Sequence, residues 1–293
     1  AQALGMAAST AVNGWMIEHS GVASAYLLSA AVLATITTYV IVVRERQGEK
    51  RMPWSHGVAH PRNLDIQVEA WWPLLKQSFK AITAISSLMM IPYLLMRAMP
   101  AGANEVYYPI LTTTITGWST SDYTNVNSAA QLGAAIFGLV LGGWIIGKVG
   151  PQRSVGLLLP MFVVLLLAIG LSPAEWSQSW FMTTVIWVNE FLGILLAIAL
   201  IPIAMQLCSP AVAATQFTIY MAIGNFGRPL GAWVAAKTTG GNSPEMMFFV
   251  IAGVFALGAA FIWLVRLPKK SPAEAEVVEH EVAHGAGVAP VEN

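Results

Sequence analysis

The chain has 293 residues, of which 56% are hydrophobic and 10% are charged, and its mean hydropathy is +0.63. Because soluble domains have about 25% charged residues, this composition indicates a membrane protein. The 15 Lys and Arg residues balance the 15 Asp and Glu residues, so the chain lacks the basic excess typical of nucleic-acid binding. The single cysteine excludes an internal disulfide.

Eight apolar stretches are long enough to cross the roughly 30 Å hydrocarbon core of a bilayer as helices. They cover residues 1–17, 21–43, 81–114, 126–147, 154–171, 180–207, 211–235 and 246–267. No basic segment precedes the first stretch, as it would in a signal peptide, and we expect the chain to begin inside a longer protein. The third stretch contains Pro92 and Pro100. It predicts one long, broken helix or, as an alternative, a shorter helix followed by a re-entrant loop.

Basic residues lie almost entirely on one side of these stretches. Twelve Lys and Arg residues lie in the segments 44–80, 148–153 and 266–270. The connections on the other side, 18–20, 115–125, 172–179 and 236–245, hold only Lys237. The positive-inside rule therefore places 44–80, 148–153, 208–210 and the C-terminal tail in the cytoplasm.

The loops also predict the domain organisation of an all-α polytopic membrane protein. Residues 1–43 would be the last two helices of an N-terminal bundle, and residues 44–80 a cytoplasmic linker between bundles. Residues 81–267 would form a six-helix C-terminal bundle, followed by a disordered cytoplasmic tail, 268–293. Each half of the six-helix part has three spans. Because three is an odd number, the two halves would insert with opposite topology, and such inverted repeats are typical of secondary transporters.

Four charged residues lie inside the expected spans, where a charge costs at least about 2.5–3.5 kcal/mol. They are Arg97, Glu105, Glu190 and Arg228. Each is therefore a candidate for a solute or proton pathway. The alternative is a structural ion pair, such as Arg97 with Glu190, that only holds helices together.

Polar side chains in the same spans suggest a shared central cavity. Gln131, Asn189, Gln216 and Asn225 are the main candidates, and Asn104, Asn127 and Thr218 accompany them. The alternative is hydrogen bonding between helices. Five aromatic residues could line the cavity or serve as packing and interface residues: Tyr107, Tyr108, Trp187, Tyr220 and Phe226. Glycines four apart, as in Gly138/Gly142 and Gly227/Gly231, permit close helix crossings.

A zinc-protease pattern, H-E-x-x-H, occurs once, near the C-terminus. On a helix, His280 and His284 could bind one Zn²⁺ while Glu281 activates the bound water. The pattern lies beyond the last apolar stretch, and no span has a histidine that could be a third ligand. A membrane-embedded metalloprotease is therefore only an alternative, and we expect neither a metal site nor another cofactor.

The turn GGWIIGKVGPQR, Gly142 to Arg153, resembles the G-x-x-x-D-R/K-x-G-R/K-R/K loop signature of the major facilitator superfamily. Here Gly147 stands in place of the Asp, and Pro151-Gln152 interrupts the basic pair. No P-loop, nucleophile elbow or dinucleotide fingerprint is present in the sequence, so an enzyme is not expected.

Residues 189 to 235 resemble the AmpG-like muropeptide permeases and their acetyl-CoA transporter relatives within that superfamily. In this branch a Glu opens a Gly-rich span and an A-T-Q-F run starts the next, which ends near G-R. Those features fall on Glu190, on Ala214-Thr215-Gln216-Phe217 and on Gly227-Arg228. Arg97 falls where the branch tends to have a basic residue. The resemblance covers roughly residues 75 to 265, and only the A-T-Q-F region is distinctive.

The resemblance implies a twelve-span facilitator, of which this chain would lack the first four spans, in a bacterial inner membrane. It implies symport of protons with a small, anionic solute such as a muropeptide. We expect Glu190 to bind the proton, and Arg97 and Arg228 to hold the anion or pair with the carboxylate. Gln131, Asn189, Gln216 and Asn225 would orient the solute. A non-transporting membrane scaffold or sensor is the remaining alternative.

Overall fold

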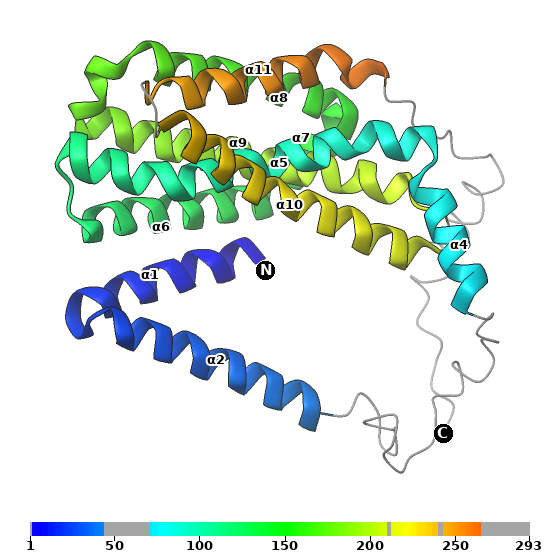
Figure 1. The fold of residues 1–293 in the computed structure, drawn as a ribbon, viewed down its shortest axis with the longest axis horizontal. Coiled ribbons are helices and arrows are strands. Elements are labelled where there is room, and N and C mark those ends of the chain that lie inside the picture. The colour runs from blue at the N-terminus through cyan, green and yellow to red at the C-terminus, as the bar shows by residue number, and fades with distance from the viewer. Residues whose placement is uncertain (1, 44–70, 210–211, 240–242, 265–293) are drawn as a thin grey trace.

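The computed structural model describes residues 2–43, 71–209, 212–239 and 243–264, and these residues form helices and turns without any β-strand (Figure 1). The α-helices are α1 (Gln2–Ser20), α2 (Val22–Val42), α4 (Trp71–Ile82), α5 (Ile85–Leu111), α6 (Thr120–Phe137), α7 (Gly143–Val149), α8 (Pro151–Leu171), α9 (Ser179–Gln206), α10 (Ala213–Thr239) and α11 (Met246–Phe261). Two π-helical segments, η1 (Thr112–Thr116) and η2 (Gly138–Gly142), follow α5 and α6. Short 3₁₀ turns are η3 (Pro173–Ser177) and η5 (Ile262–Leu264).

The described residues of all eight expected stretches are predominantly helical. Within the described residues, five segments are long and apolar enough to cross a membrane: part of α2, α6 with η2 and α7, α8, α9, and α11 with η5. A sixth is obtained if the bent pair of α4 and α5 is one span. The protein is thus a helical protein that fits a multi-pass membrane topology. α1 and α10 are less apolar, so the number of eight spans stays a prediction.

The third stretch is broken, as predicted, but at a different position. The helix was expected to break around its prolines, but α5 runs without interruption through Pro92, Pro100 and Pro109. The break lies earlier, at Thr83 and Ala84, where α4 and α5 meet at an angle of 73°. Proline removes one helical hydrogen bond, and neighbouring helices can satisfy the freed groups. Continuous packing along α10 accompanies the uninterrupted α5.

The crossing of α5 and α10 depends on glycine. A Cβ atom at Gly227 would lie 2.1 Å from the Leu95 carbonyl oxygen, and one at Gly231 would lie 2.0 Å from that of Met99. The two backbones therefore touch, as the four-residue spacing of these glycines predicts. Gly138 and Gly142 similarly approach Ile194 and Ile198 of α9. These contacts bring α5, α6, α9 and α10 together around one space.

Large apolar side chains fill the part of the bundle between α5, α8, α9 and α11, beside this space. Phe162 and Phe255 pack with ring centroids 5.0 Å apart, and both are fully buried. The indole of Trp176 donates a hydrogen bond to the Ile169 carbonyl at 3.0 Å. This core holds the bundle in register, and it leaves the polar faces of α5 and α9 turned toward α6 and α10.

The N-terminal helices join the bundle through α1, which packs along α6. The Ser121 hydroxyl donates to Glu18 at 2.8 Å, and Gly14 lies against Thr124. α2 contacts α1 and is largely exposed (Figure 1). Of the expected linker 44–80, residues 71–80 belong to α4, whereas 44–70 and the expected tail 268–293 lie outside the described residues. The assignment of two bundles stays a prediction.

Candidate functional site

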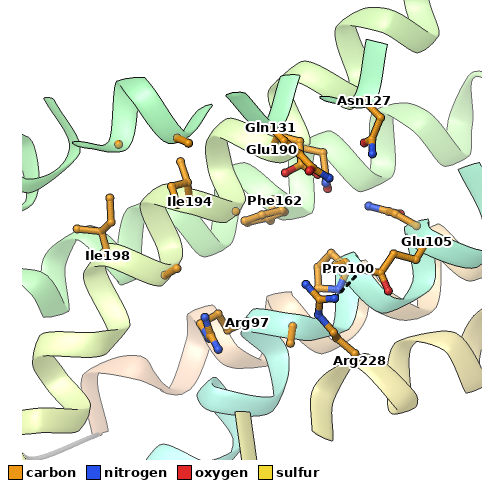
Figure 2. A pocket seen from close by; sticks show the side chains of 18 of the residues that line it. Arg97, Pro100, Glu105, Asn127, Gln131, Phe162, Glu190, Ile194, Ile198 and Arg228 are labelled. Atoms are coloured by element: carbon orange, nitrogen blue, oxygen red, sulfur yellow. Dashed lines mark hydrogen bonds and ion pairs between the residues drawn. The ribbon is translucent and has the colours of Figure 1, made fainter. Parts of the chain in front are cut away.

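A cavity of about 520 Å³ opens between α5, α6, α9 and α10, with Leu4 of α1 at its edge. This volume lies within the roughly 300–1,000 Å³ of small-molecule sites. Seven of the eight predicted pathway residues line it: Arg97, Glu105, Gln131, Asn189, Glu190, Asn225 and Arg228. The polar residues of four helices, distant in sequence, therefore do converge (Figure 2).

Helical spacing explains how α5 and α6 present their polar side chains. Arg97, Asn104 and Tyr108 recur at intervals of seven and four residues, so they share one face of α5. α6 begins with a capping box in which the Ser119 hydroxyl accepts a hydrogen bond from the Asp122 amide at 3.1 Å. The Asp122 carboxylate in turn accepts one from the Ser119 amide at 2.9 Å. This box sets where α6 starts and hence which of its faces meets the cavity.

An ion pair joins α5 and α10 at the cavity. Arg228 of α10 donates to Glu105 of α5 at 2.7 Å, and the side chains are 40% and 55% exposed. The sequence suggested Arg97 with Glu190 as a structural pair, but this pair is not found among the described residues. Because the Arg228 and Glu105 side chains are accessible to solvent, their pairing contributes little to stability.

Among the described residues, Arg97 is the cation of the cavity that has no ion-pair partner. Its Nε atom is buried and has no hydrogen-bond partner in the described part of the chain. The guanidinium lies beside Gly224, where a Cβ atom would be 3.6 Å from Nη2. Figure 2 shows Arg97 and Arg228 on one side of the cavity and Glu190 with Gln131 on the other. The cavity therefore has guanidinium groups on one side and a carboxyl and an amide group on the other.

Neutral polar groups around the cavity are also without protein partners. The side-chain oxygen and nitrogen of Asn104, the oxygens of Gln131 and Asn189, and the Tyr108 hydroxyl are buried and make no hydrogen bond within the described residues. Such atoms are rare in native proteins and each costs about 1–3 kcal/mol. These residues all line the cavity, so its lining contains a group of polar atoms that the described protein does not satisfy.

Along α9 the cavity changes from polar to apolar. Asn189 and Glu190 line its polar end, while Ile194, Ile198 and Ile201 follow at helical spacing toward the other end. There, Gly138 of η2 allows α6 to approach Ile194 closely, since a Cβ atom would lie 2.8 Å from the Ile194 side chain. The cavity therefore has two chemically different ends.

Gln216 is the predicted pathway residue that does not line the cavity. It is buried near the start of α10, where its amide nitrogen donates to the Tyr220 hydroxyl at 2.7 Å and its oxygen accepts from the Ser209 amide at 2.7 Å. Tyr220 in turn donates to the Ser87 hydroxyl at 2.6 Å. These side chains satisfy one another between α5 and α10. A role of Gln216 in the pathway stays a prediction.

Of the aromatic candidates, only Tyr108 lines the cavity. Tyr107 packs edge-on against Trp176 and Phe248, Trp187 stacks on Phe191, and Phe226 is exposed. Sequence reasoning missed Tyr123, which lines the cavity from α6. Its spacing of four residues from Asn127 and of eight from Gln131 could have identified it, because these positions share one helix face.

The zinc-protease pattern at His280, Glu281 and His284 lies outside the described residues. Within the described residues, no group of three or more His, Cys, Asp or Glu side chains could hold a metal ion. No protein-family model matches the chain, and comparison with curated proteins finds no match either.

Proposed function

We propose that this chain belongs to a secondary transporter of the major facilitator type, in the AmpG-like branch, which moves a small anion together with protons. A muropeptide is the proposed solute, and a bacterial inner membrane, with the C-terminus in the cytoplasm, is the proposed location. The observation that supports this best is the pairing of chemistries across one cavity. Arg97, which has no ion-pair partner among the described residues, lies across the cavity from the Glu190 carboxyl group (Figure 2). Asn104, Gln131 and Asn189, whose amide oxygens also lack partners in that part of the chain, line the same cavity.

In this proposal Arg97 binds the anionic group of the solute. A guanidinium forms strong, charge-assisted hydrogen bonds with carboxylates and phosphates, and no protein anion pairs with Arg97 among the described residues. Asn104, Gln131 and Asn189 would hydrogen-bond neutral amide and hydroxyl groups of the same solute. A solute that has both kinds of group would satisfy the buried atoms that lack partners.

Glu190 is the proposed proton carrier. It faces the arginines across the cavity and, unlike Glu105, has no ion-pair partner among the described residues. A bound anion near Glu190 makes a second negative charge in these low-dielectric surroundings costly, so Glu190 would bind a proton when the solute anion is bound. Glu105, paired with Arg228, would keep the second cation occupied until the solute competes for it.

The test is uptake of a radiolabelled muropeptide into proteoliposomes under an imposed inward proton gradient. We expect Glu190→Gln to abolish accumulation driven by the gradient, while exchange of solute at equal concentrations continues, because only proton binding is lost. Glu175→Gln is the matched control, since Glu175 is exposed in η3, away from the cavity. Unchanged accumulation by Glu190→Gln would contradict the proton role.

The anion role of Arg97 has a separate test in the same vesicles. Arg97→Gln is expected to weaken solute binding roughly tenfold to a hundredfold, which corresponds to loss of a hydrogen bond to a charged group. Arg153→Gln, at the exposed start of α8, is the control. If the unchanged protein accumulates another anion but no muropeptide, the mechanism stands and the proposed solute is wrong.

A further inference from the structure

Helix α4 has an exposed apolar face. Trp72, Leu75 and Phe79 are spaced by three and four residues, so they lie on one side of the helix. Their side chains are 61%, 52% and 69% exposed. Three large apolar side chains that share one helix face mark an interaction surface rather than ordinary scattered exposure.

Two lysines border this face. Lys76 and Lys80 follow Trp72 at intervals of four residues, and both are exposed. An apolar face with lysines beside it is typical of a helix that lies in a membrane interface. In that position the lysine stems extend along the apolar layer while the ammonium groups reach the headgroups. The charge favours an anionic surface over a neutral one.

The orientation of α4 agrees with such a position. α4 makes an angle of 73° with α5. If α5 crosses the bilayer near its normal, α4 lies close to the membrane plane. Figure 1 shows α4 turning away from the start of α5, near the start of α10. The positive-inside count places this end of the bundle in the cytoplasm, where anionic lipids are concentrated.

The bend between α4 and α5 is held by buried side chains. At the bend, the Ala81 carbonyl accepts a hydrogen bond from the Ser87 hydroxyl at 2.7 Å. Ser87 in turn accepts from Tyr220 of α10, which accepts from Gln216. Since all three side chains are almost fully buried, the direction of α4 is set by the bundle. The cluster also links α4 to the turn before α10 through the Ser209 amide.

We propose that α4 is an interfacial helix that binds the headgroups of anionic phospholipids in the membrane around the protein. Trp72, Leu75 and Phe79 face the acyl chains, and Lys76 and Lys80 contact the phosphates. This surface is separate from the cavity, so the proposal does not depend on transport.

The depth of α4 can be measured with nitroxide labels on single cysteines, in a Cys208→Ser background that has no other thiol. Leu75→Cys places the label on the apolar face, and Gln77→Cys places it on the opposite side of the helix. In vesicles of phosphatidylcholine with phosphatidylglycerol, we expect oxygen to reach position 75 more readily than a water-soluble nickel chelate does. The reverse is expected at position 77. Phe79→Cys repeats the first measurement if Leu75→Cys does not fold.

Lipid selectivity is measured by the association of spin-labelled phosphatidylglycerol and phosphatidylcholine with the protein. We expect Lys76→Gln with Lys80→Gln to lower the preference for phosphatidylglycerol at this site, by about fivefold for each lysine removed. High salt should have the same effect on the unchanged protein. Lys237→Gln is the matched control, because Lys237 is an exposed lysine at the other end of α10.

Several results would overturn the proposal. Access of the chelate to both positions would place α4 in water, and access of oxygen alone to both would make α4 part of the membrane span. A label at position 75 that neither reagent reaches would mean that protein covers this face. An unchanged phosphatidylglycerol preference in the double lysine variant would show that the surface is not selective for anionic lipid.

Discussion

Two groups of buried polar side chains lie in this bundle, and they differ in whether their hydrogen bonds are satisfied. In the Gln216 cluster, formed by Gln216, Tyr220 and Ser87, side chains from α5 and α10 bond to one another and to backbone groups. Around the cavity, Asn104 has no partner for either side-chain atom in the part of the chain that the structure describes. Similar residue types thus hold helices together in one place and lack hydrogen-bond partners among the described residues in the other. The free energy of unfolding of single variants separates these two roles.

The largest effect is expected for Gln216→Leu. Leucine removes both polar atoms, so the Tyr220 hydroxyl and the Ser209 amide each lose a short hydrogen bond. Two or three buried groups without partners should lower the free energy of unfolding by roughly 2–3 kcal/mol. Denaturant unfolding of the protein in detergent micelles measures this. If Gln216→Leu lost less unfolding free energy than the cavity variant Asn104→Leu, the two groups would not differ as proposed.

Tyr220→Phe tests the same cluster with less change of shape. The ring is retained, but Ser87 loses its donor and Gln216 loses an acceptor. The expected cost is about 1–2 kcal/mol. Unfolding under the same conditions provides the measurement, and Tyr93→Phe is a useful comparison, since the Tyr93 hydroxyl makes one hydrogen bond, to the Gly258 carbonyl at 3.1 Å. If Tyr220→Phe lowered the free energy of unfolding less than Tyr93→Phe does, the hydrogen bonds of the Gln216 cluster would contribute little to stability.

Asn104→Leu is expected to leave stability unchanged or to raise it by up to about 1 kcal/mol. It removes two buried atoms that have no partner within the described residues, and apolar replacement of unsatisfied groups is neutral or favourable. Solute uptake should fall at the same time. A clear loss of stability would indicate that Asn104 has a structural partner, and the cavity would then resemble the Gln216 cluster.

The smallest effect on stability is expected for Arg228→Gln. The ion pair with Glu105 joins α5 to α10, but both side chains are substantially exposed, so its loss should cost less than about 1 kcal/mol. Thermal unfolding at low and high salt checks this. A larger cost that disappears in salt would show that the pair holds the two helices together rather than serving the cavity.

Much of the cavity could be predicted because charge is rare in the spans. Arg97 and Glu190 stand out in helices that are otherwise apolar, and the cost of placing them there requires a reason. Gln216 could not be separated from the cavity residues in this way, because an isolated glutamine does not reveal which neighbours it meets. Tyr123 was missed since a tyrosine near a helix start is common as an interface residue.

In the α4–α5 region, tertiary packing rather than the positions of the prolines decides where the helix bends. The break predicted inside the third apolar stretch exists, but it lies at Thr83 and Ala84, and α5 is continuous through Pro92 and Pro100. Proline weakens a helix locally. Whether the helix then bends depends on the packing along α10 and on which side chains are near enough to satisfy the freed carbonyls.

Composition and hydropathy alone determined that this chain is helical and suited to a membrane, because apolar stretches of such length have few other stable forms in lipid. They also determined which residues are costly to place in the spans. Tertiary structure decided which of those residues meet at the cavity and which satisfy one another elsewhere. That choice depends on the crossing of α5 with α10, where Gly227 and Gly231 let the backbones touch, and helix contacts between distant segments are not encoded in any local pattern.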